Sequence, residues 1–328
     1  MRLFLVVALL AFAGWSLSAI GPSAAPAQGI DTTPLADRAG DGRAVLVTGA
    51  STGIGRATAE LLAARGFHVY ACARKQADLD ALEAIDGITA VRLDVTIQAE
   101  VDAAVATVTE AGRGLYGLIN NAGVVVAAPL IEVTEEDLDF QLDVNVRGPW
   151  RVTRAFAPLL IESGGRVATT GSISGVVCWG LGGPYTMSKH AVEAFTDVLA
   201  LELEPLGVQV SVVEPGNYRS AIMTSMVERM KERGYTTEGS LYEDQLEGLL
   251  GSRLDRGQYK EPTEVAEAFL RALTDERAKR RYLVVPHAGE AEATLRAGLR
   301  RVVQQNAGQP YELTRDELVT MLDELLGP

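Results

Sequence analysis

From Arg43 onward, short apolar runs alternate with longer segments of helical periodicity. The runs are rich in valine and apolar at consecutive positions, which is typical of parallel strands buried on both faces. Strands are predicted at Ala44–Val47, His68–Ala73, Thr89–Leu93, Gly117–Asn120, Arg166–Thr170, Val208–Val213 and Tyr282–Val285. Helices expected between them include Gly55–Arg65, Ile97–Ala111, Glu135–Glu162 and Tyr185–Leu206. This alternation predicts an α/β fold with a doubly wound parallel sheet.

The segment Asn217–Glu261 interrupts this alternation. It is polar and mixed in charge, and it carries Met223, Met226 and Met230 at helical spacing. One interpretation is an amphipathic helix packed on the core. The other is a lid whose methionines supply an adaptable apolar wall, and the position after the sixth strand favours the lid.

Residues 287–328 continue beyond the last predicted strand and are expected to form a C-terminal helical extension. Helices are predicted at Glu290–Gln305 and Thr314–Leu326. Thr314 and Glu317 have the spacing of a capping box, which indicates where the second helix begins.

The N-terminal segment, residues 1–28, precedes a polar linker at 29–42 and the α/β domain at 43–286. It begins with Arg2 and the apolar stretch Leu3–Ile20, followed by small residues. This order is typical of a secretory signal peptide, and the stretch is also long enough for an uncleaved membrane anchor. Both interpretations predict an exported or membrane-anchored protein, while a cytoplasmic location stays open.

Composition narrows the function classes. The chain has 328 residues, 47% of them apolar, which is enough for one large domain with a sizeable core. Its net charge of −13 argues against a nucleic-acid partner, because an acidic surface repels phosphates. Cys72 and Cys178 lack metal-ligand spacing, and we expect no metal site.

A glycine-rich turn joins the first strand to the first helix. Its sequence is Thr48-Gly49-Ala50-Ser51-Thr52-Gly53-Ile54-Gly55. Glycines at such a turn allow the backbone to approach a pyrophosphate closely, and the helix N-terminus adds free N–H groups and a positive dipole. This context predicts a dinucleotide site that includes Thr48, Gly49, Ser51, Gly53, Ile54 and Gly55.

Tyr185 and Lys189 stand four residues apart at the start of a predicted helix, which places both side chains on one face. A tyrosine with an unperturbed pKa near ~10 is a poor acid or base at neutral pH. A fixed ammonium group nearby favours the phenolate and lowers that pKa. The pair therefore predicts proton transfer to or from a substrate oxygen.

These motifs, together with Asp94, Asn120-Asn121-Ala122-Gly123 and Pro215-Gly216, resemble the short-chain dehydrogenase/reductase family over residues 43–286. The stretch Tyr185–Gly216 is similar to the branch of retinol dehydrogenases and 17β-hydroxysteroid dehydrogenases. The resemblance implies a Rossmann-type domain and a homo-oligomer formed through its two long helices.

The resemblance also implies roles for individual residues. Asp94, Asn121, Ala122, Gly123, Pro215 and Gly216 would contact the cofactor, and Ser220 stands where relatives carry a threonine near the nicotinamide carboxamide. Ser172 would stabilise negative charge on the substrate oxygen, with Ser174 as a competitor. Asn145 would hold a water that links Lys189 to solvent, or it is a buried asparagine at a helix kink.

The end of the second strand indicates the cofactor. NAD sites usually carry an acidic residue about 20 residues past the glycines. Here Ala73 holds that position, followed by Arg74 and Lys75, which can bind a 2′-phosphate. This predicts NADP(H), with NAD as the alternative, although Thr52 stands where many NADP-preferring relatives have a basic residue.

We therefore expect an oxidoreductase that transfers a hydride between NADP(H) and a hydrophobic secondary alcohol, ketone or lipid aldehyde. Candidates for the substrate pocket are Cys178, Trp179, Leu181 and Tyr218. His190 is expected to be structural, because it points away from its neighbour Lys189 on a helix. The alternative is a non-catalytic regulator or scaffold that binds NAD(P) on the same fold.

Overall fold

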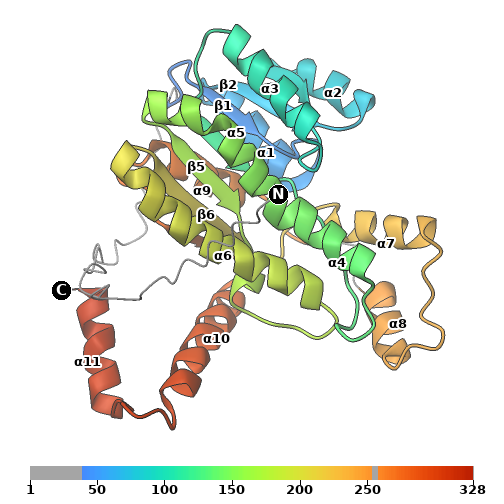
Figure 1. The fold of residues 1–328 in the computed structure, drawn as a ribbon, viewed down its shortest axis with the longest axis vertical. Coiled ribbons are helices and arrows are strands. Elements are labelled where there is room, and N and C mark those ends of the chain that lie inside the picture. The colour runs from blue at the N-terminus through green and yellow to red at the C-terminus, as the bar shows by residue number, and fades with distance from the viewer. Residues whose placement is uncertain (1–38, 253–257, 328) are drawn as a thin grey trace, which may run out of the picture. The chain divides into compact units, whose positions relative to one another are not determined.

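The computed structural model describes residues 39–252 and 258–327, and its centre is a seven-stranded parallel sheet (Figure 1). The strand order is β3-β2-β1-β4-β5-β6-β7, which confirms the doubly wound α/β fold. The predicted signal or anchor segment, and the linker up to residue 38, lie outside the described residues. The strands are β1 Ala44–Val47, β2 His68–Ala73, β3 Ile88–Arg92, β4 Gly117–Asn120, β5 Arg166–Thr170, β6 Gln209–Pro215 and β7 Arg281–Val284.

Helices cover both faces of the sheet, which explains why the central strands are apolar at consecutive positions. One buried cluster joins the sheet to α1 Gly53–Ala64, α2 Gln76–Glu83 and α9 Thr263–Thr274. The cluster on the other face includes side chains of α3 Gln98–Glu110, α5 Gly148–Ser163 and α6 Gly183–Leu203. Because all the strands are parallel, their carboxyl ends lie at the same edge of the sheet. This is the edge at which α/β sheets bind ligands.

The predicted helical segment Glu135–Glu162 is helical along its length, but it is not one regular α-helix. Two α-helices, α4 Glu135–Leu142 and α5, are joined by a π-helical turn at Asp143–Arg147. Pro149 lacks the N–H that would bond the carbonyl of Asn145, which weakens the regular α-helical hydrogen bonding at this point. The turn places Asn145 on the side of α4 and α5 that faces the site.

The lid segment contains two helices, α7 Ile222–Glu232 and α8 Glu243–Ser252.

Residues 35–302 form one compact unit, and the chain from Val303 onward belongs to another. The extension folds as α10 Ala288–Asn306 and α11 Arg315–Leu326. The predicted capping box is present, since Thr314 and Glu317 each accept the backbone N–H of the other. Within the described ranges, no helix has the length and apolar character needed to cross a membrane.

Candidate functional site

A cavity of about 290 Å³ lies at the carboxyl ends of the strands, where the glycine-rich turn and the start of α6 meet. It brings together most of the residues predicted for the cofactor and for catalysis. Those that line it are Gly49, Ser51, Gly53, Ile54, Gly55, Arg74, Asp94, Asn121, Ala122, Gly123, Ser172, Tyr185, Lys189, Pro215, Gly216 and Ser220.

The glycine-rich turn has a shape that only glycines allow. Gly49 and Gly53 have φ angles of 64° and 54°, a region that other residues rarely adopt. A Cβ at Gly55 would stand 2.2 Å from the carbonyl oxygen of Gly49 and 2.3 Å from Asn121 Nδ2. The turn thus leaves space in front of the N-terminus of α1, as a bound pyrophosphate requires.

Thr48 does not line the cavity, although it was predicted to contact the cofactor. Its buried Oγ1 accepts the backbone N–H groups of Asn121 (2.9 Å) and Ala122 (3.0 Å). In return, Asn121 Nδ2 donates to the carbonyl oxygens of Thr48 and Gly49. Thr48 therefore ties the β4 loop to the glycine turn from behind the cavity.

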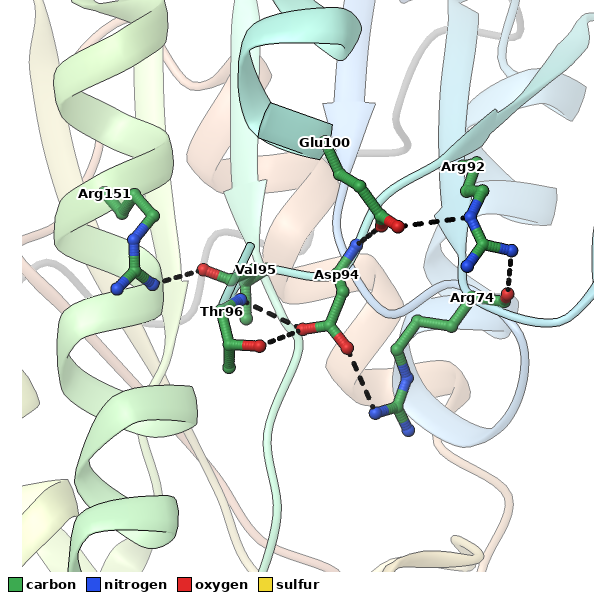
Figure 2. A network of polar contacts seen from close by, with 7 residues as sticks. All are labelled: Arg74, Arg92, Asp94, Val95, Thr96, Glu100 and Arg151. Atoms are coloured by element: carbon green, nitrogen blue, oxygen red, sulfur yellow. Dashed lines mark hydrogen bonds and ion pairs between the residues drawn. The ribbon is translucent and has the colours of Figure 1, made fainter. Parts of the chain in front are cut away.

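At the end of β2, Ala73 is buried and Arg74 extends into the cavity with a side chain that is 62% exposed. Arg74 Nη1 lies 3.5 Å from Asp94 Oδ2, an ion pair that solvent weakens (Figure 2). Lys75 does not line the cavity; it precedes the first turn of α2.

The backbone that carries Arg74 and Asp94 is fixed by neighbouring side chains (Figure 2). Arg92 donates to the carbonyl oxygen of Arg74 (2.9 Å), and Glu100 accepts from Arg92 and from the N–H of Asp94. Burial raises the pKa of Asp94, but hydrogen bonds from Thr96 and the charge of Arg74 outweigh it and leave the pKa below its ordinary value. Asp94 is therefore an anion at neutral pH.

Lys189 is buried beside Tyr185, with its Nζ 5.6 Å from the centre of the phenol ring. The ammonium group donates to the carbonyl oxygen of Thr170 at 2.7 Å. Burial lowers the pKa of Lys189 to about 8, and the charge of Glu193 opposes this shift. At neutral pH the lysine still carries the positive charge that favours a phenolate at Tyr185.

Of the two candidate serines, Ser172 lines the cavity and Ser174 does not. Ser172 Oγ accepts the backbone N–H of Ser174 at 3.0 Å, so its hydroxyl proton stays available to a substrate oxygen. Ser174 Oγ instead accepts from the indole of Trp179 at 3.3 Å.

Of the four residues proposed for the substrate pocket, Tyr218 lines this cavity, whereas Cys178, Trp179 and Leu181 do not.

Asn145 lies behind the cavity, in the π-helical turn. Its Oδ1 accepts the N–H of Val124 at 2.9 Å, and its Nδ2 donates to the Val124 carbonyl and to Ser188 Oγ. The amide thus fixes the loop after the Asn-Ala-Gly element, which agrees with the buried asparagine at a helix kink. A water relay to Lys189 stays a prediction.

Sequence reasoning missed Ile222, Ser225 and Arg229, which bring α7 to the cavity wall. Arg229 donates to the carbonyl oxygen of Val125, with its guanidinium 4.8 Å from the centre of the Phe140 ring. This segment therefore forms part of the cavity wall, as the lid interpretation expects.

The expected methionine wall is absent from the cavity lining. Met223 and Met226 are buried in a separate apolar cluster, and Met230 packs against that cluster.

His190 has partners that leave no role for it in the cavity. Its Nδ1 is 3.0 Å from the carbonyl oxygen of Thr186, and its Nε2 is 2.8 Å from the guanidinium of Arg301 on α10. The ring therefore connects α6 to the first part of the C-terminal extension, in agreement with the structural role expected for it.

Comparison with known proteins gives consistent matches. A family model described as short chain dehydrogenase matches residues 43–231. Human 17-beta-hydroxysteroid dehydrogenase type 6 is 39% identical over 195 residues, which cover 57% of this chain and 61% of that protein. The match thus spans less than two thirds of the relative.

Two solved structures share the fold. A short chain dehydrogenase/reductase from Burkholderia phymatum in complex with NAD is 26% identical, with a TM-score of 0.70 over 84% of this chain and 99% of that one. An actinorhodin polyketide ketoreductase with NADPH is 28% identical, with a TM-score of 0.63 over 76% and 97% of the two chains. Structural neighbours therefore bind either nicotinamide cofactor.

Proposed function

The chain belongs to the short chain dehydrogenase family, and we propose that it transfers a hydride between NADP(H) and a hydrophobic secondary alcohol, ketone or lipid aldehyde. One observation carries the proposal. Ser172, Tyr185 and Lys189 line the same cavity as the glycine turn, so a dinucleotide on the turn reaches the proton-transferring groups.

Each polar side chain has a separate task in this proposal. The nicotinamide, when bound, supplies the hydride to a carbonyl carbon or accepts it from an alcohol. Tyr185 gives a proton to the oxygen as its negative charge develops, or takes one in the reverse direction. Lys189 lowers the pKa of that phenol through its charge, and Ser172 donates a hydrogen bond to the same oxygen.

The preference for NADP(H) rests on the end of β2. A ribose 2′-OH has no carboxylate to bind there, because Ala73 occupies the position and is buried. A 2′-phosphate would form an ion pair with the exposed Arg74 guanidinium. It would compete with Asp94, whose Oδ2 is 3.5 Å from Arg74 Nη1.

A hydrophobic substrate fits the cavity wall beside the catalytic groups. Val124, Tyr218, Ala221 and Ile222 are among the residues that line the cavity. The relative named as a hydroxysteroid dehydrogenase supports a secondary alcohol of this kind.

Fluorescence titration of the full chain with NADPH and NADH tests the cofactor. We expect tighter NADPH binding and a dissociation constant for NADPH that rises roughly 10-fold or more in Arg74→Ala, since a charge-assisted hydrogen bond contributes about 1.5–3 kcal/mol. NADH binding should change little. Lys75→Ala is the matched control, because this adjacent cation does not line the cavity. Tighter NADH binding, or equal losses in both variants, would contradict the NADP(H) proposal.

A further inference from the structure

Two acidic side chains that the proposed reaction does not use lie together behind the Ser172 loop. Glu193 comes from α6 and Glu214 from β6, and their side chains are only 13% and 6% exposed. The two carboxyl groups are close enough for Arg281 Nε to contact both of them, at 3.0 Å from Glu193 Oε2 and 3.5 Å from Glu214 Oε1. Two buried carboxylates at such a distance repel each other strongly unless something neutralises one of them.

Glu193 is in contact with the backbone that carries Ser172. A Cβ at Gly175 would stand 2.8 Å from Glu193 Oε1, and one at Gly171 would stand 3.1 Å from the same atom. These glycines flank Ser172 on both sides, so the carboxyl group supports the loop from behind. Glu193 also follows Lys189 by one helical turn, which places its charge near the ammonium group.

The charges around the pair do not balance two carboxylates. Arg281 on β7 is the cation in contact: its Nε is 3.0 Å from Glu193 Oε2 and 3.5 Å from Glu214 Oε1. Its Nη2 binds Asp197 of α6 at 2.7 Å, so part of its charge is already used. The charge of Asp197 adds to the repulsion by raising the pKa of Glu193, and the charge of Glu193 in turn raises the pKa of Lys189.

Glu193 Oε1 and Glu214 Oε1 are buried and accept no hydrogen bond from the described residues. The 3.5 Å contact of Arg281 Nε with Glu214 Oε1 is an ion pair without hydrogen-bond geometry. A proton held between the two groups makes one of them a donor and reduces this deficit. The electrostatics agree, since burial and the charge of Glu193 raise the pKa of Glu214 to about 8. Burial also raises the pKa of Glu193, while the charge of Arg281 opposes that shift, so the geometry and the electrostatics favour one proton held by the pair at neutral pH.

We propose that Glu193 and Glu214 share one proton and act as positioning residues for the catalytic groups. The negative charge that remains on Glu193 keeps Lys189 protonated, and the hydrogen-bonded pair holds the loop of Ser172 in place. The effect on turnover rests on the proposed function, whereas the shared proton does not.

Infrared spectroscopy of the full chain tests the shared proton without a substrate. We expect the carbonyl absorption of a protonated carboxyl group at pH 7, and its loss in Glu214→Gln. Glu193→Gln should also weaken it, because Glu214 then loses the neighbouring charge that raises its pKa. Asp197→Asn is the control: it also removes a partner of Arg281, but Asp197 is half exposed and the absorption should persist. An absorption that survives in Glu214→Gln would overturn the proposal.

The pH dependence of kcat tests the positioning role. In Glu193→Gln the pKa of Lys189 should fall, so activity should be lost as pH rises at a value lower by about one unit. Asp197→Asn, outside the pair, should follow the wild type up to pH 8. Glu214→Gln keeps a donor to Glu193, so its pH profile should shift less than that of Glu193→Gln. A kcat that drops equally at every pH in Glu193→Gln would show a merely structural residue and overturn the role. A wild type without turnover would refute the proposed function instead, leaving the infrared result to decide the shared proton.

Discussion

The two ends of the cavity are built in different ways. Around the glycine turn, uncharged groups hold each other: Thr48 Oγ1 binds two backbone N–H groups, and Asn121 Nδ2 binds two carbonyls. Around the start of α6, by contrast, the side chains that interact are ionisable and largely shielded from solvent. They are Lys189 and Glu193 of α6 and Glu214 of β6. Substitutions in the glycine turn should therefore disrupt cofactor binding through steric collisions, at any pH. Substitutions at the catalytic end should instead act by changing charge, so their effects on activity and stability should depend on pH.

Tyr185→Phe should separate the two ends most strongly. It removes the acidic proton and leaves the shape of the cavity nearly unchanged, so we expect kcat to fall about 100- to 10,000-fold. The dissociation constant for NADPH should stay within about 3-fold of the wild type, because no part of the glycine turn changes. Steady-state kinetics and cofactor titration on the same preparation measure both. Retained turnover would favour a different acid, and retained cellular function without turnover would support the regulator alternative.

Gly55→Ala should break the cofactor end alone. The added methyl group meets the Gly49 carbonyl at 2.2 Å and Asn121 Nδ2 at 2.3 Å, neither of which can move without opening the turn. We expect a roughly 100-fold weaker NADPH affinity and a stability loss of about 1–3 kcal/mol, typical of overpacking. Both effects should be the same at pH 6 and pH 8, as measured by titration and urea unfolding.

Gly180→Ala is the matched control for this substitution, because nothing stands within 4 Å of its Cβ position. An affinity loss in Gly55→Ala no larger than that in Gly180→Ala would contradict the steric explanation. A loss that changed with pH would instead make the cofactor end resemble the catalytic end.

The sheet and the cavity could be predicted because their signals are local. Consecutive apolar residues mark each strand, and parallel strands bring the following loops to one edge, so motifs far apart in the sequence meet there. Local patterns could not show Thr48 turning away from the cavity toward the β4 loop. That direction depends on the backbone of Asn121 and Ala122, which only the folded sheet brings near.

The α7 segment shows a different limit of sequence reasoning. Its helical spacing predicts one apolar face but not which face points to the cavity. In the structure Met223 and Met226 pack with Val125 and Ala127, so the cavity receives Arg229 from an adjacent face of the helix. The π-helical turn at Asn145 was equally hidden, because periodicity across Glu135–Glu162 stays close to that of one continuous helix.

A further effect concerns the stability of the catalytic end. The pKa of Glu214 is about 8 in the folded chain, against an ordinary value of 4.5, so between these values the folded state holds one proton more than the unfolded state. The free energy of unfolding should therefore fall as pH rises through this window, by at most about 1.4 kcal/mol per pH unit from this group. Glu214→Gln cannot lose a proton, so its unfolding free energy should decline less between pH 6 and pH 9.

Urea unfolding at several pH values measures this difference, and Glu202→Gln, a change at an exposed position of α6, is the control that should follow the wild type. Between pH 6 and pH 8 the decline from this group is at most about 2.8 kcal/mol, comparable to the loss expected for Gly55→Ala. Its dependence on pH makes it the test specific to buried charge. If the unfolding free energies of Glu214→Gln and the wild type changed with pH in parallel, Glu214 would be ionised throughout. The contrast between a steric and an electrostatic end of the cavity would then rest on Lys189 alone.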